Sequence, residues 1–306
     1  MSALTISGDF GSEKPVDRST PAAALTATPS KEKTMEKALP VVSGVPASEK
    51  LGNAARAVLP PLLGILVLLG IWHVATFKGG SIPGPAQVWQ AALALFADPF
   101  YRNGPNDQGI GWNVLSSLQR VGIGFGFAAL VGIPLGFILG RSQFLAAMVN
   151  PIISLLRPVS PLAWLPIGLL VFKKADPAAT YTIFICSIWP MIMNTAQGVQ
   201  RVPQDYLNVA RVLALSEWKV VTKILFPAVL PYMLTGIRLS IGTAWLVIVA
   251  AEMLTGGVGI GFWVWDEWNN LKVEHIIIAI FVIGIVGLIL EQALILLARK
   301  LTKEAA

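Results

Sequence analysis

Residues 208–227 read NVARVLALSEWKVVTKILFP and form a long polar and charged interlude between two strongly apolar blocks. Its apolar residues from 205 to 215 recur at near-helical spacing, with Pro203 expected at the first helical position. Ser216 is expected to cap a second short helix, which is basic and aromatic and which Pro227 would end. Two short amphipathic helices at a membrane surface are typical of a docking device.

The composition around this stretch is that of an integral membrane protein. The chain has 306 residues, of which 55% are hydrophobic and only 13% charged, whereas a soluble domain carries about 25% charged residues. Several apolar runs reach the roughly 20 residues that cross a bilayer as a helix. The formal net charge of +6 reflects Lys and Arg at the ends of these runs, which indicates membrane topology and no affinity for nucleic acid. Cys186 is the single cysteine, so it is interpreted as a small buried apolar residue.

The order of the apolar runs predicts an all-α protein with about six transmembrane helices. Residues 1–55 are expected to be a polar, disordered tail, and residues 56–306 a transmembrane domain. The expected spans are residues 58–77, 113–140, 144–172, 178–199, 228–251 and 275–298. Prolines within 144–172 should break that span. Pairs of glycines four residues apart in 113–140, from Gly122–Gly126 to Gly136–Gly140, should allow a neighbouring helix to approach closely.

The distribution of basic residues predicts the orientation in the membrane. With both termini in the cytoplasm, the inner segments hold most of the Lys and Arg, including Arg141, Arg211, Lys219 and Arg299. This arrangement satisfies the positive-inside rule and places residues 203–227 in the cytoplasm.

Residues 208–227 resemble the cytoplasmic Glu-Ala-Ala loop of the permease subunits of bacterial ABC importers. Asn208 stands on the family's Glu position, and Ala214 stands on its Gly position, which weakens the prediction of a turn with positive φ there. The segments 155–166 and 250–261 resemble those of nitrate/taurine-type permeases, and the similarity covers about residues 119–300. The loop 103–109 is similar to that of cyanobacterial nitrate and bicarbonate permeases. The resemblance assigns ATPase docking to Asn208, Val209, Ala210, Arg211, Ala214, Ser216, Trp218, Ile224, Phe226 and Pro227.

The resemblance implies the type I importer permease fold and a set of partners in the bacterial inner membrane. These would be a second permease copy, two ABC ATPase subunits that hold ATP and Mg, and an extracytoplasmic anion-binding protein, besides membrane lipid. This chain itself would bind no cofactor. Nitrate, with nitrite, is the first choice of substrate, and bicarbonate, cyanate and sulfonates remain alternatives.

Ionisable and polar residues near membrane depth are the candidates for the translocation path, because such groups usually face a bundle interior or a wet cavity. For Gln119 and Arg120 the alternative is snorkelling to lipid head groups. Arg157 and Trp164 lie among prolines, where pore lining competes with a structural ion pair. Arg238 is expected to balance Glu252 within the bundle, which ranks above a ligand role for either.

Catalytic motifs are absent from the sequence, which predicts a non-enzymatic subunit. It has no G-x-x-x-x-G-K-[ST] phosphate loop and no His-Glu-x-x-His. The two histidines, His73 and His275, have no neighbouring ligands at metal-binding spacing, so no metal site is expected. A membrane-embedded enzyme would need catalytic pairs inside the spans. An ion-coupled secondary transporter, the other alternative, usually has two halves with matching broken helices.

Overall fold

A computed structural model describes residues 47–77, 79 and 82–305, which are mostly helical. The chain divides into two units, Met1–Leu59 and Pro60–Ala306. Most of the predicted tail lies outside the described residues, and its predicted end at residue 55 falls within the first helix. The helices are α1 (Ala47–Thr76), α2 (Pro85–Leu95), α3 (Ile110–Arg141), α4 (Gln143–Leu156), α5 (Pro161–Phe172), α6 (Ala175–Gln200), α7 (Gln204–Val212), α8 (Glu217–Val220), the π-helix η1 (Val221–Leu225), α9 (Phe226–Thr255), α10 (Ile260–Asn269) and α11 (Val273–Ala305).

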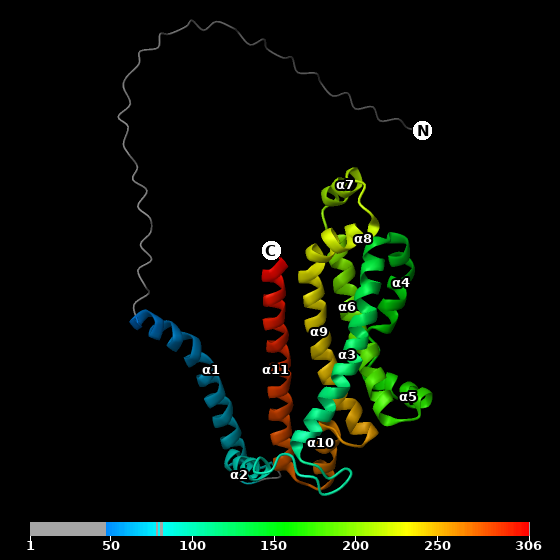
Figure 1. The fold of residues 1–306 in the computed structure, drawn as a ribbon. Helices are drawn as coiled ribbons and strands as arrows, with labels where there is room; N and C mark the ends of the chain where they lie inside the picture. Colours follow the sequence, from blue (N-terminus) through cyan, green and yellow to red (C-terminus); the bar gives the residue numbers. More distant parts are fainter. Residues whose placement is uncertain (1–46, 78, 80–81, 306) are drawn as a thin grey trace, which may run out of the picture. The chain divides into compact units, whose positions relative to one another are not determined.

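Three long helices, α3, α6 and α9, pack together as the centre of the second unit (Figure 1). Small residues on α3 permit this packing. A Cβ on Gly136 would lie 2.5 Å from Thr195 Cβ, and one on Gly124 would lie 2.8 Å from Ile183 Cβ, both on α6. Gly122, in contrast, faces open space, as does Gly126. The predicted close helix approach is therefore correct for positions 132 to 140, while at the start of α3 the contact is made by Gly124.

The predicted break in the third apolar segment is confirmed. Helices α4 and α5 meet at an angle of 99° across residues 157–160. Pro158 lies within the break and Pro161 begins α5, and neither residue has a backbone N–H to donate. Ser160, directly before Pro161, has ψ of 135°, the extended conformation that a following proline favours. The segment therefore cannot continue as one straight helix.

Four helices among the described residues are long and apolar enough to span a membrane, and the bent pair α4–α5 would make a fifth. The remaining expected span, residues 178–199, corresponds to α6, which has 26 residues. It is less apolar than the other spans because it includes many small and polar residues. Much of it is buried against α3 and α9, so it has less need of a lipid-compatible surface.

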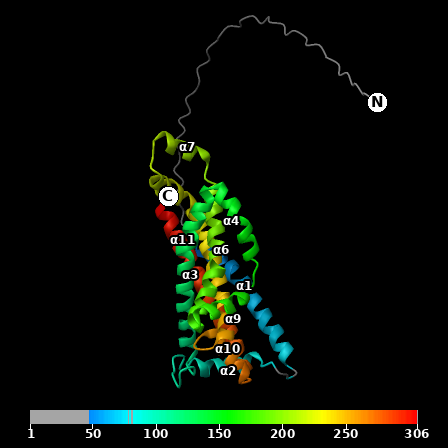
Figure 2. The ribbon, with the colours of Figure 1, turned by 90° about the vertical axis from the view of Figure 1, so that its right-hand side faces the viewer.

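The segment between α6 and α9 projects from one end of the bundle, and α2 and α10 lie at the other end (Figures 1 and 2). Pro227 was expected to end the second short helix, and that prediction is wrong. α8, η1 and α9 run on as one helical segment from Glu217 to Thr255. Pro227 lies in the first turn of α9, directly after the wider π-helical turn. A π-helical turn leaves the regular i→i−4 pattern, which lets the chain pass a residue that has no N–H.

Candidate translocation site and docking surface

Helix α7 has one buried face and one exposed face. Ala210 is 2% exposed and packs with Val220, Leu225 and Val229 in a small apolar cluster. On the other face Val212 is 85% exposed. Ala210 therefore holds α7 on the bundle and offers no side chain to a partner, which corrects its assignment as a docking contact. The apolar side chain of Val212 on this exposed face favours contact with a partner over contact with water.

The turn after α7 holds the left-handed residue that the sequence did not predict. Ala214 has φ of 48°, although it carries a Cβ, and the Leu215 N–H donates to the Ala210 carbonyl at 3.0 Å. This hydrogen bond satisfies a carbonyl at the end of the helix, as in other left-handed helix ends. The replacement of Gly by Ala therefore does not remove the positive φ at position 214, because the sharp reversal needs this conformation whichever residue occupies it.

The second short helix follows this turn at once. Ser216 is its N-cap residue, as predicted, but its side chain makes no capping hydrogen bond. Trp218, within the same short helix, is 76% exposed. Arg141, the last residue of α3, donates from Nη2 to Glu217 Oε2 at 2.8 Å. This ion pair joins the segment between α6 and α9 directly to a central helix of the bundle.

The remaining predicted docking residues divide by exposure. Asn208, Val209 and Arg211 are exposed on α7. Ile224 is half-buried in the cluster beneath the loop, and the Phe226 ring stacks on Phe137 of α3 with centroids 6.5 Å apart. Ile224 therefore supports the loop from below, whereas Phe226 keeps 45% of its surface exposed while one side of its ring rests on α3.

At the other end of the bundle, Glu252 lies inside a polar cluster between α3 and α9. It is 1% exposed. Its carboxylate accepts hydrogen bonds from Ser117 Oγ at 2.7 Å, from the Gly261 N–H at 3.0 Å and from Arg120 Nη1 at 2.5 Å. A buried carboxylate needs this number of donors, because burial otherwise disfavours its charge.

The loop between α9 and α10 closes over this cluster. Asn113 Oδ1 accepts from the Gly259 N–H, and Ser117 Oγ accepts from the Ile260 N–H, both at 2.9 Å. A Cβ at Gly259 would collide with the Glu252 carboxylate. The glycines in this loop therefore let the backbone approach a buried charge closely.

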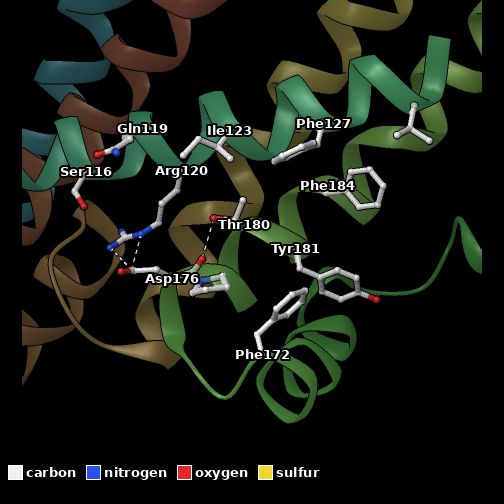
Figure 3. A pocket seen from close by; sticks show the side chains of 12 residues that line it. Ser116, Gln119, Arg120, Ile123, Phe127, Phe172, Asp176, Thr180, Tyr181 and Phe184 are labelled. Atoms are coloured by element: carbon white, nitrogen blue, oxygen red, sulfur yellow. Dashed lines mark hydrogen bonds and ion pairs between the residues drawn. The ribbon is translucent and has the colours of Figure 1, made fainter. Parts of the chain in front are cut away.

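Arg120 links the buried cluster to an open cavity. Its side chain is 12% exposed, and besides Glu252 it contacts Asp176, in the first turn of α6. Nε donates to Asp176 Oδ1 at 2.9 Å, and Nη2 lies 2.7 Å from the same oxygen. Figure 3 shows the two side chains meeting in the lining of the cavity, Arg120 from α3 and Asp176 from α6. Snorkelling is therefore not the role of Arg120.

The cavity has a volume of about 680 Å³ between α3, α5 and α6. Its polar lining is gathered near Arg120, and its apolar lining includes Phe127, Phe172 and Phe184. The polar residues are Ser116, Gln119, Arg120, Asp176, Thr180 and Tyr181. A mostly apolar cavity with a few converging polar groups is the usual form of a small-ligand site.

The other predicted path residues lie away from this cavity. Arg238 does not pair with Glu252; its guanidinium contacts Glu291 of α11, so the predicted balance of charges was wrong. Arg157 is exposed at the break between α4 and α5. Trp164 is half-buried and packs against the main apolar core.

Three residues of the site were missed by sequence reasoning. Asn113 and Ser117 precede Arg120 at helical spacing, so one polar face on α3 was visible in the sequence. Asp176 carried no such signal, because only the packing of α6 on α3 brings it to Arg120.

A bundle of long apolar helices, with an exposed amphipathic helix at one end and an open, mostly apolar cavity that holds a few polar groups, fits a membrane transport subunit. Residues 132–303 match the family of the binding-protein-dependent transport system inner membrane component. The chain belongs to this family, which is one of multi-pass inner-membrane proteins that work with ATPase subunits and a binding protein.

Relatives and a solved structure agree with this assignment. The chain is 48% identical to the nitrate import permease protein NrtB of Synechocystis sp. over 77% of its length and 86% of that protein. It is 44% identical to the bicarbonate transport system permease protein CmpB of Synechococcus elongatus, over 77% and 86%. A chain of the inward-facing MetNI methionine ABC transporter matches with a TM-score of 0.52 at 14% identity, covering 63% of this chain and 94% of that one. The predicted ABC importer permease fold is confirmed.

Proposed function

We propose that this chain is the permease subunit of an ATP-driven importer of nitrate, with nitrite as a second substrate. Two copies would enclose the path, two ATPase subunits would hydrolyse ATP, and a separate protein would deliver the anion. The 48% identity to a nitrate import permease over most of both chains carries the substrate assignment. The 44% identity to a bicarbonate permease makes bicarbonate the second candidate.

The exposed face of α7 is the proposed ATPase-docking surface. Asn208, Val209 and Arg211 are exposed on α7, Trp218 is exposed on α8, and Ala214 provides the turn between the two helices. The C-terminal end of α11 lies at the same end of the bundle (Figure 1), which supports a cytoplasmic C-terminus under the positive-inside rule. A cytoplasmic N-terminus completes the proposed topology. Closure of the ATPases would rock the bundle through α7 and the Arg141–Glu217 pair.

The proposed translocation path includes the cavity beside Gln119 and Arg120. Glu252 would contribute to this path indirectly, because its carboxylate fixes the position of the Arg120 guanidinium. Other parts of the path in the complete assembly would be lined by Arg157, Trp164 and Arg238. The partly exposed Arg238–Glu291 ion pair supports this, because an ion pair at membrane depth needs protein or water around it.

Anion-stimulated ATP hydrolysis by the complex in lipid vesicles tests this proposal. The chain, its ATPases and its binding protein would be reconstituted together, and nitrate, bicarbonate and a sulfonate compared. Stimulation by nitrate above the other two is expected. Stimulation by bicarbonate alone would move the assignment to the second candidate. Uptake driven by an ion gradient without ATP would contradict an importer of this class.

A further inference from the structure

The two carboxylates on Arg120 differ sharply in how firmly they are held. Glu252 has a side chain only 2% exposed and accepts from three donors. The Asp176 side chain is 73% exposed. An exposed carboxylate exchanges easily between an ion pair and water, whereas a buried one cannot leave its donors. Only Asp176 is therefore free to move away from the guanidinium.

The geometry of the exposed pair is also incomplete. Nε and Nη2 both point to a single oxygen, Asp176 Oδ1. This edge of a guanidinium fits two parallel hydrogen bonds to two oxygens of a planar oxyanion. A mobile oxyanion in the cavity could accept from Nε with one oxygen and from Nη2 with a second oxygen. Asp176 instead presents the single oxygen Oδ1 to both nitrogens.

We propose that Asp176 is a displaceable internal ligand that occupies the Nε–Nη2 edge of Arg120 until a planar oxyanion in transit takes its place. Glu252 binds Nη1 throughout, so the Nε–Nη2 edge of the Arg120 guanidinium stays directed into the cavity. The negative charge of Asp176 weakens anion binding and keeps the site from holding its cargo tightly. Rapid transport requires such weak binding, because an ion that binds strongly leaves slowly. This inference rests on the proposed function for the nature of the cargo.

A cysteine probe in the cavity tests the exchange without relying on transport. Thr180 lines the same cavity as Arg120 and Asp176, so Thr180→Cys in a Cys186→Ala background places one thiol on this chain beside the site. The reconstituted complex would be labelled with an anionic methanethiosulfonate reagent at increasing nitrate concentrations. Mass spectrometry of this chain would give the labelling rate.

Nitrate is expected to slow labelling, and Asp176→Asn should lower the half-protecting nitrate concentration by about two- to fivefold. Asp98→Asn is the matched control, because Asp98 is an exposed aspartate outside the cavity. It should leave that concentration unchanged. Arg120→Lys keeps the charge without the two-donor edge and should reduce protection.

Equal protection in Asp176→Asn and Asp98→Asn, or no protection by nitrate in any variant, would overturn the inference. Loss of protection in Asp176→Asn would also overturn it, since Asp176 would then be a required ligand. ATP hydrolysis by the same samples separates the two proposals. A shift in protection without nitrate-stimulated hydrolysis would refute only the substrate assignment. Stimulated hydrolysis without a shift would refute only the role of Asp176.

Discussion

Ser117 Oγ lies 2.8 and 2.7 Å from the two carboxylate oxygens of Glu252, which is 135 residues away in the sequence. The same hydroxyl oxygen accepts the Ile260 N–H. One serine thus ties α3 to the end of α9 and to the start of α10. The arrangement fixes the buried charge that in turn holds Arg120 at the cavity.

Removal of the Glu252 carboxylate is expected to destabilise the bundle strongly. Glu252→Ala leaves Arg120 without its buried partner and leaves Ser117 and the Gly261 N–H unsatisfied, at a cost of about 3–5 kcal/mol. Thermal unfolding of the purified complex would measure the loss. Glu217→Ala is the control, because it breaks an ion pair whose carboxylate is 78% exposed and should cost about 0–1 kcal/mol. Equal effects would show that Glu252 is not structurally essential.

The glycines of α3 should differ in their tolerance of alanine. Gly136→Ala brings a Cβ within 2.5 Å of Thr195 Cβ and 2.8 Å of the Ile192 carbonyl, so α3 and α6 must separate. Overpacking of this kind costs about 1–3 kcal/mol. Gly122→Ala, with nothing within 4 Å, should be neutral. The melting temperatures of the two variants would measure this difference. A Gly136→Ala protein as stable as the unchanged chain would contradict the close packing of α3 on α6.

A charge on the exposed face of α7 should release the ATPase. Val212→Asp leaves the fold of this chain intact, because Val212 is 85% exposed. It would bury an unpaired charge in a docked complex and weaken docking by about tenfold or more. Co-purification of ATPase subunits with this chain measures the effect. Leu271→Asp is the control, since Leu271 is 80% exposed in the turn between α10 and α11. Unchanged co-purification of Val212→Asp would place the docking surface elsewhere.

The left-handed turn at Ala214 should be improved by glycine. Ala214→Gly removes the steric strain of a Cβ at φ of 48° and should stabilise the turn by about 1 kcal/mol. Ala214→Val should weaken it, because a β-branched residue tolerates that region least. The rate of proteolysis between α7 and α8 reports on local opening of the loop. Faster cleavage of the glycine variant would contradict this account.

Periodicity explains why the long helices and the two short helices between α6 and α9 could be predicted from the sequence. Apolar runs of membrane-spanning length, prolines in residues 144–172 and the amphipathic pattern of residues 204–212 are local signals. The end assigned to Pro227 was wrong because the π-helical turn that precedes this proline depends on how the segment packs. The role given to Ala210 was wrong because helical spacing does not identify which face meets the bundle.

The sequence by itself determined the class of protein, the order of its spans, the broken third segment and the position of the amphipathic segment between α6 and α9. These properties depend on residues close together in the chain. The tertiary structure alone decided the partners of each buried charge: Glu252 with Arg120 and Ser117, Arg238 with Glu291, and Asp176 with the open edge of Arg120. A charge inside a bundle takes the donors that packing brings within hydrogen-bonding distance, and those donors lie on helices far apart in the sequence.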